Sequence, residues 1–164
     1  MIDLRNIGPD KWEIWKHLRL AALIEAPYAF GSKLAEWRNA PEKQWRDRLC
    51  IPGAYQVIAF LHGTAVGMAG GLRTDKPEIA ELVSMWVVPA VRGRGIGDAL
   101  IAAVEEWAQG IGATRLRLEV VEDNNPALNL YLRNGFIEVE LESDGQEQIS
   151  VYRERVLLKD LRRG

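Results

Sequence analysis

The stretch Val87-Val88-Pro89-Ala90-Val91-Arg92-Gly93-Arg94-Gly95-Ile96-Gly97 decides which fold we predict for this chain. The run Glu81–Val88 is almost continuously apolar, which is typical of a strand buried on both faces. Pro89 ends this strand, and an amphipathic helix follows, with apolar residues at helical spacing: Ile96, Leu100, Val104, Trp107 and Ile111. Glycines allow close approach of a ligand to the backbone, and the free amides of a new helix attract anions. The stretch therefore predicts a strand, a glycine turn and a helix that together can bind a pyrophosphate.

The glycine turn by itself leaves two interpretations open. It does not match the dinucleotide fingerprint G-x-G-x-x-G, because counting from Gly93 places Asp98 where the third glycine belongs. It also lacks the Gly-Lys-Ser/Thr of a P-loop. Arg92 and Arg94 add guanidinium donors that suit phosphate. Glycines serve purely structural turns as well, so a structural turn and a phosphate site are both compatible with this segment alone.

The rest of the chain predicts a mixed sheet with helices on both faces, because strands and helices alternate only in the second half. Arg115–Val121 alternates between polar and apolar residues, as a half-buried strand does. The other predicted elements are a strand over Ile2–Asn6, a helix capped by Asp10 and Glu13, a loop over Glu25–Ser32, a helix from near Asn39 with Pro41 in its first turn, a hairpin of Tyr55–Leu61 and Ala65–Leu72, a short helix capped by Asn124 or Asn125 and ended by Asn134-Gly135, and two strands over Phe136–Leu141 and Ile149–Leu158.

Composition excludes several classes of protein. The 164 residues suit one domain, 1–164, with one core, and the single cysteine, Cys50, cannot form an internal disulfide. With 48% hydrophobic residues and a net charge of −2, the chain is neither disordered nor a general nucleic-acid binder. The longest apolar run, Leu82–Val91, is shorter than the roughly 20 residues of a membrane span. The charged start of the chain does not resemble a signal peptide, so we expect a cytoplasmic protein without a membrane partner.

Three segments resemble one known family. Arg92-x-x-Gly95-x-Gly97, directly after a strand that ends Val-x-Pro, resembles the acyl-CoA-binding motif of the GNAT N-acetyltransferase superfamily. Asn124-x-x-Ala127-x-x-Leu130-Tyr131-x-x-x-Gly135-Phe136 resembles the second motif of that family. The N-terminal segment 18–32 is similar to small bacterial members. The resemblance implies an α/β (α+β) GNAT fold, with a mixed, mostly antiparallel sheet of about seven strands that is splayed at its centre and has helices on both faces.

The resemblance also implies where acetyl-CoA would bind and where CoA would leave as product. The coenzyme would lie in the cleft where the strands Glu81–Val88 and Arg115–Val121 splay apart. Its pantetheine arm would pair with the backbone of the first strand, and a backbone amide there would stabilise the oxyanion of the thioester. Asp98 would turn its side chain away from the pyrophosphate. The implied coenzyme-binding residues are Met85, Trp86, Val87, Arg92, Gly93, Arg94, Gly95, Ile96, Gly97, Asp98 and Asn124.

The implied reaction is attack of an amine on the thioester, which needs a base for the amine and an acid for the departing thiolate. Tyr131 matches the tyrosine that donates a proton to the coenzyme sulfur in the family, although a tyrosine on an amphipathic helix needs no such role. Glu81 and Glu119 are both candidates for the base, since burial in an apolar strand would raise their pKa values. Each is also explained as a strand carboxylate paired with an arginine, and Arg117 shares the polar face of Glu119.

The acceptor is the least determined part of the prediction. We expect the acceptor to be the primary amine of a small molecule. Tyr28, Phe30 and Trp37, which lie outside both motifs, are candidates to line the acceptor site. A protein or peptide amine is an alternative, and so is a non-catalytic acyl-CoA-binding or sensor module. No residues have metal-ligand spacing, so no metal site is predicted. A homodimer is possible, because dimers are frequent in the family.

Overall fold

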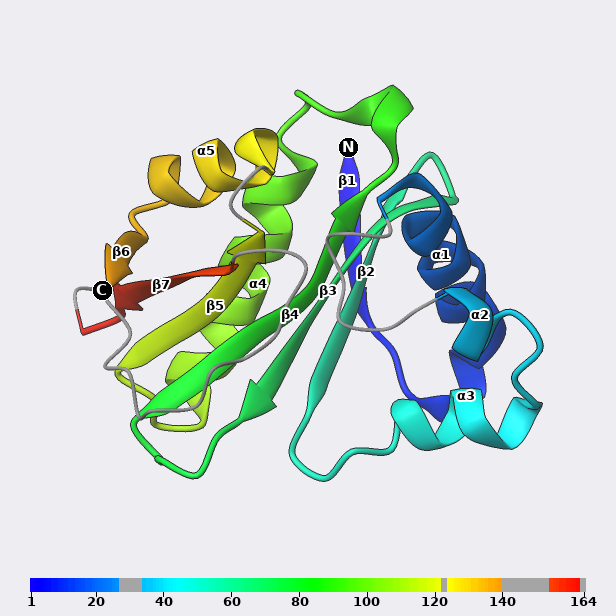
Figure 1. The fold of residues 1–164 in the computed structure, drawn as a ribbon, viewed down its shortest axis with the longest axis horizontal. Helices are drawn as coiled ribbons and strands as arrows, with labels where there is room; N and C mark the ends of the chain where they lie inside the picture. The colour runs from blue at the N-terminus through cyan, green and yellow to red at the C-terminus, as the bar shows by residue number, and fades with distance from the viewer. Residues whose placement is uncertain (27–33, 122–123, 140–153, 163–164) are drawn as a thin grey trace.

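The computed structural model describes residues 1–26, 34–121, 124–139 and 154–162, which form one sheet with helices on both faces (Figure 1). The strands are β1 (Ile2–Asn6), β2 (Tyr55–Leu61), β3 (Thr64–Arg73), β4 (Ile79–Val87), β5 (Arg115–Val121), β6 (Ile137–Val139) and β7 (Glu154–Asp160). The α-helices are α1 (Trp12–Glu25), α2 (Leu34–Trp37), α3 (Glu42–Arg48), α4 (Ile96–Gly110) and α5 (Asn125–Arg133), and two short 3-10 helices are η1 (Pro9–Lys11) and η3 (Pro89–Val91).

The sheet has the strand order β1-β2-β3-β4-β5-β7-β6. Each neighbouring pair is antiparallel except β4 and β5, which are parallel. The hairpin between β2 and β3 turns at His62 and Gly63, which have φ of 51° and 79°. This architecture confirms the predicted mixed, mostly antiparallel sheet.

The sheet is splayed at its centre, as predicted. The parallel ladder between β4 and β5 consists of the pairs Ile79 with Arg115, Ala80 with Leu116 and Glu81 with Arg117. Beyond Glu81 the two strands diverge toward the carboxyl ends (Figure 1). A bulge in β4 lies opposite β3 in the same region, with Ser84 at φ 55°. The edge of β4 that faces β5 is therefore without a strand partner among the described residues from Leu82 onward.

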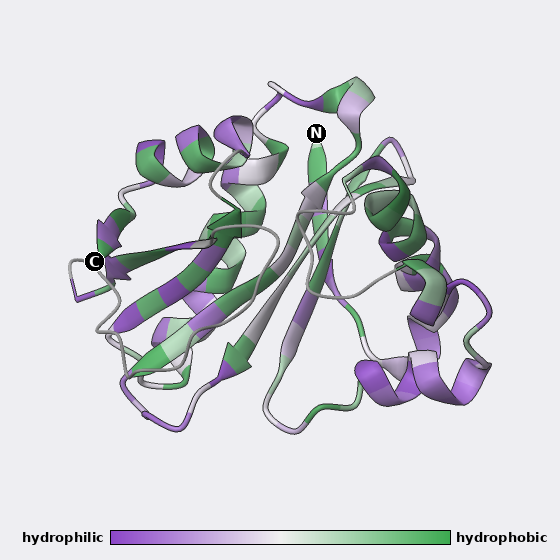
Figure 2. Ribbon diagram, viewed as in Figure 1, coloured by the Kyte–Doolittle hydropathy of each residue, from purple (hydrophilic) through white to green (hydrophobic). Residues whose placement is uncertain are grey.

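Two apolar clusters hold the helices against opposite faces of the sheet. On one face α4 packs its buried residues, among them Leu100 and Val104, against strands β2 to β5 (Figure 1). On the other face Trp15 of α1 and Trp45 of α3 pack against Ile58 and neighbouring residues of β2 and β3. The alternation of β5 between hydrophobic and hydrophilic residues is visible in Figure 2. No helix in the described part of the chain is long and apolar enough to cross a bilayer.

Several predicted boundaries were wrong in detail. Helix α1 is preceded by η1, and Lys11 is its N-cap with no side-chain cap, so Asp10 and Glu13 do not form the expected capping box. Pro41 is the N-cap of α3 rather than part of its first turn. The four-residue helix α2 was not predicted, because it is too short to show a helical pattern. The expected turn at 143–145 lies outside the described residues.

Candidate active site

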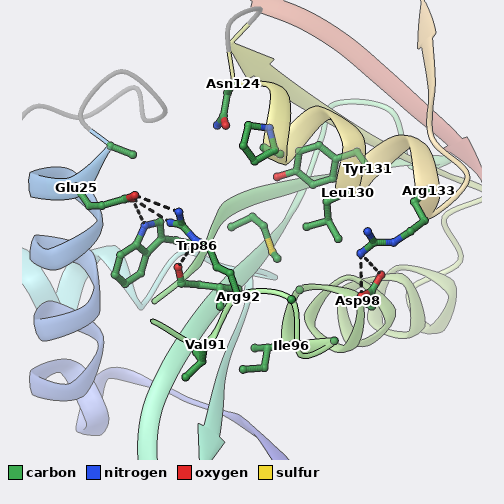
Figure 3. Close-up of a pocket in the computed structure, with 18 residues that line it drawn as sticks. Glu25, Trp86, Val91, Arg92, Ile96, Asp98, Asn124, Leu130, Tyr131 and Arg133 are labelled. Atoms are coloured by element: carbon green, nitrogen blue, oxygen red, sulfur yellow. Dashed lines mark hydrogen bonds and ion pairs between the residues drawn. The ribbon is translucent and has the colours of Figure 1, made fainter. Parts of the chain in front are cut away.

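A cavity of about 600 Å³ lies at the end of β4, in the region where β4 and β5 diverge (Figure 3). Its walls come from β4, the glycine turn, the first turn of α4, the helix α5 and the end of α1. The lining residues include the predicted acid Tyr131 and most of the predicted coenzyme site: Met85, Trp86, Val87, Arg92, Gly93, Gly95, Ile96, Gly97, Asp98 and Asn124. The structure thus brings both sequence motifs to one cavity.

The glycine turn and the first turn of α4 line this cavity. Gly93 and Gly95 have φ of 84° and 82°, a conformation that favours glycine. Gly95 is the N-cap of α4 and, as a glycine, has no side chain to cap the amides of the first turn. The amides of the first turn, together with the positive end of the helix dipole, suit an anion such as a pyrophosphate. Arg92 adds a guanidinium to the same rim.

Glu25 lines the cavity, although nothing in the sequence indicated a role for it. Its carboxylate accepts hydrogen bonds from Trp86 Nε1 at 2.9 Å and from both terminal nitrogens of Arg92 at 3.1 Å (Figure 3). Arg92 Nε also donates to the Val87 carbonyl at 3.0 Å. The hydrogen bonds from Arg92 hold the pKa of Glu25 below its usual value. The sequence around Glu25 does not indicate that it pairs with Arg92, because the two residues are 67 positions apart and only the fold brings them together.

Asp98 turns its carboxylate toward α5. It accepts hydrogen bonds from Arg133 Nη2 at 3.0 and 3.1 Å and from Asn134 Nδ2 at 2.8 Å (Figure 3). The hydrogen bond from Asn134 is the main cause of a pKa below the usual value for Asp98. This pairing neutralises an acid beside the glycine turn and fastens the end of α5 to α4.

Tyr131 lies on α5 with its side chain at the cavity (Figure 3). The residue is 6% exposed, and its ring makes an edge contact with Phe136 at a centroid distance of 5.9 Å. Burial raises the pKa of the Tyr131 phenol, so its hydroxyl keeps its proton at neutral pH. Asn124 is the N-cap of α5, as predicted, but its side chain makes no capping hydrogen bond. Its amide therefore remains available to the cavity.

Glu81 and Glu119 lie outside the lining of this cavity and share one arginine. Arg117 Nη2 donates to Glu119 Oε1 at 2.8 Å, while Arg117 Nη1 is 3.6 Å from Glu81 Oε2. Glu81 belongs to the last pair of the parallel ladder, at the point where the strands separate. Burial raises the pKa of the Glu81 carboxyl, Arg117 lowers it and Glu119 raises it.

The other predicted site residues are not brought to the cavity. Arg94 is exposed on the glycine turn and is not one of the lining residues. Trp37 packs on Trp45 at a ring-centroid distance of 4.7 Å. Tyr28 and Phe30 lie outside the described residues. No cluster of three or more His, Cys, Asp or Glu suited to a metal ion occurs in the described ranges.

The fold and the cavity together define an α/β protein with a glycine turn at a cavity beside two splayed strands. The model of the acetyltransferase (GNAT) family matches residues 17–136, and the chain belongs to this family.

Known relatives differ in what their names say they act on. A mycothiol acetyltransferase from Renibacterium salmoninarum is 31% identical over 140 residues, which cover 82% of this chain and 40% of that protein. The chain thus spans about two fifths of the length of that relative. The N-alpha-acetyltransferase RimI from Mycobacterium tuberculosis is 38% identical over 103 residues, covering 62% of this chain and 63% of that protein.

Solved structures confirm the fold. A GNAT-family acetyltransferase from Streptococcus pneumoniae superposes with a TM-score of 0.74 over 98% of this chain and 99% of that chain, at 19% identity.

Proposed function

We propose that this protein is an acetyl-CoA-dependent N-acetyltransferase that transfers the acetyl group to a primary amine of a small molecule by direct attack in a ternary complex. The proposal rests on one observation: the same cavity is lined by the glycine turn, by the Tyr131 side chain and by the part of β4 that has no pairing with β5. A pure binding module needs the first two of these features but not a buried phenol.

The residues around the cavity fit the parts of the coenzyme. The first-turn amides of α4 and the Arg92 guanidinium would hold the pyrophosphate. The edge of β4 that faces away from β3 at Met85–Val87 would pair with the pantetheine arm, and Asn124 would add an amide contact. Acetyl-CoA supplies an acyl group already activated as a thioester. A backbone amide of β4 would stabilise charge on the thioester oxygen.

Two side chains would move protons. The amine must be neutral to attack, and Glu81 is the better suited of the two predicted bases, because burial raises its pKa and its contact with Arg117 is longer than that of Glu119. Glu81 would take the proton that the amine loses, and Tyr131 would donate its phenolic proton to the departing thiolate. Exchange with solvent would then remove the proton from Glu81 and return one to Tyr131. Activity should therefore rise with pH as Glu81 loses its proton.

The acceptor class is supported by the mycothiol acetyltransferase, the relative that covers the larger share of the chain. A peptide N-terminus is the second candidate, and the similarity to RimI favours it. Both acceptors present a primary amine, so the chemistry within the cavity is the same for both.

The test is to incubate purified protein with acetyl-CoA and a panel of polyamines, amino sugars, amino acids and short peptides. Release of free CoA thiol with acetylation of a small amine, identified by mass spectrometry, is the expected result. Acetylation of peptides but of no small amine would contradict the small-molecule acceptor and support the peptide acceptor. Tight binding of CoA with no thiol release for any amine would instead favour an acyl-CoA sensor.

A further inference from the structure

Arg117 lies between two glutamates at the point where the central strands separate. Its guanidinium is 2.8 Å from Glu119 Oε1 and 3.6 Å from Glu81 Oε2. Arg117 and Glu81 are partly buried, with exposed side-chain fractions of 26% and 28%, whereas Glu119 is exposed at 42%. Coulomb interactions between them are therefore less screened than those of fully exposed ion pairs.

The arginine is shared unequally. The contact with Glu119 is a hydrogen bond, whereas 3.6 Å exceeds hydrogen-bond distance, so Glu81 feels only the charge of the guanidinium. We propose that Glu119 is a positioning residue: it holds the Arg117 guanidinium away from Glu81 and leaves the Glu81 carboxylate available to take a proton. This inference rests on the proposed function, in which Glu81 is the base.

The charged groups that face Glu81 within the described part of the chain both come from β5, and they are Arg117 and Glu119. On its other side, β3 places Leu72 opposite Glu81. A guanidinium hydrogen-bonded to a carboxylate lowers the pKa of that carboxyl by about 1–3 units. Transfer of Arg117 from Glu119 to Glu81 would thus offset the effect of burial and weaken the base.

The experiment is a side-chain carboxyl titration of all glutamates by NMR, with the Glu81 signal assigned from Glu81→Gln. In Glu119→Gln, Arg117 is free to pair with Glu81, and the pKa of Glu81 should fall by about one unit. In Arg117→Gln, the attraction is lost, and the pKa should rise. Glu119→Asp keeps the charge but retracts the carboxylate by one methylene, so a smaller fall is expected.

Glu138→Gln is the matched control, because Glu138 pairs with Arg155 across β6 and β7 at 3.7 Å, away from Glu81. It should leave the Glu81 titration unchanged. A fall in the pKa of Glu81 in Glu119→Gln and a rise in Arg117→Gln support the proposal. In each variant the acid limb of kcat/KM should move in the same direction as that pKa. A Glu81 titration that does not respond to Glu119→Gln overturns it. Displaced titrations without any acetyl transfer from acetyl-CoA would support the positioning of Arg117 and overturn the proposed function instead.

Discussion

Glu25 and Arg92, 67 positions apart in the sequence, form two hydrogen bonds of 3.1 Å at the rim of the cavity. The pair joins the last residue of α1 to the glycine turn, and Trp86 Nε1 fixes the same carboxylate from β4. One consequence is structural, since three separate elements meet at this carboxylate. The other is electrostatic, because a negative charge lies next to the amides proposed to hold a pyrophosphate.

Replacing Glu25 with Gln should therefore tighten CoA binding. Removal of one negative charge near an anionic ligand, together with release of Arg92, should lower the Kd by about two- to fivefold at low ionic strength, and less at about 0.5 M salt. Calorimetric titration with CoA measures this change. Glu106→Gln, on the exposed side of α4, is the control and should have no effect. Weaker binding by the Glu25 variant would mean that the carboxylate acts mainly as a brace for the turn.

Replacing Tyr131 with Phe should reduce kcat by about 100-fold while the affinity for CoA stays nearly constant. The variant keeps the ring and its edge contact with Phe136, so its thermal stability should change little. Steady-state kinetics and CoA titration separate the two effects. Tyr55→Phe is a matched control, because Tyr55 stacks on Trp107 and does not line the cavity. Unchanged turnover in the Tyr131 variant would remove this residue from the mechanism.

The parts of the fold with a local signal were predictable from the sequence. Helix α4 has a continuous apolar stripe, and β5 alternates over most of its length, so β5 was predicted at its observed bounds and α4 with the apolar face that it buries. The hairpin at His62-Gly63 was found because only particular residues accept positive φ. The start of α1 was mispredicted because a 3-10 turn over Pro9–Lys11 replaces the expected cap, which no sequence pattern distinguishes.

The candidate site also has parts that the sequence indicates and parts that it does not. The glycine turn and Tyr131 were found because each belongs to a motif with fixed spacing. Glu25 was missed, because its partners are 61 and 67 positions away and only the fold brings them together. The choice between Glu81 and Glu119 stayed open for a similar reason. It depends on how Arg117 is shared, with contacts of 3.6 Å to Glu81 and 2.8 Å to Glu119, and only the register of β4 against β5 brings Glu81 beside Arg117.

Replacing Asp98 with Asn should slightly lower the free energy of unfolding at neutral pH, and this loss should shrink in acid. The folded-state pKa of Asp98 lies below its ordinary value of 3.8, so its contribution is present above that pH and is lost as the pH falls further. Because Asp98 and Arg133 are 40% and 63% exposed, the loss at pH 7 should be under about 1 kcal/mol. Urea unfolding at pH 7 and near pH 3 should reveal a difference that is smaller in acid. Asp75→Asn, at an exposed position, is the control. An undiminished difference in acid would show that the charge of Asp98 is not its cause.

Replacing Gly95 with Ala should separate the conformational role of the glycine turn from its binding role. Gly95 has φ of 82°, and a Cβ added there would meet no atom within 4 Å, so the cost is backbone strain of about 1–2 kcal/mol. Gly63→Ala is a closely matched control: φ is 79°, the space is equally open, and the hairpin lies away from the cavity. Both variants should lose similar stability in urea unfolding. Only Gly95→Ala should also weaken CoA binding, by roughly tenfold, because its strain displaces the amides at the start of α4. Equal CoA affinity in the two variants would contradict a pyrophosphate site at this turn.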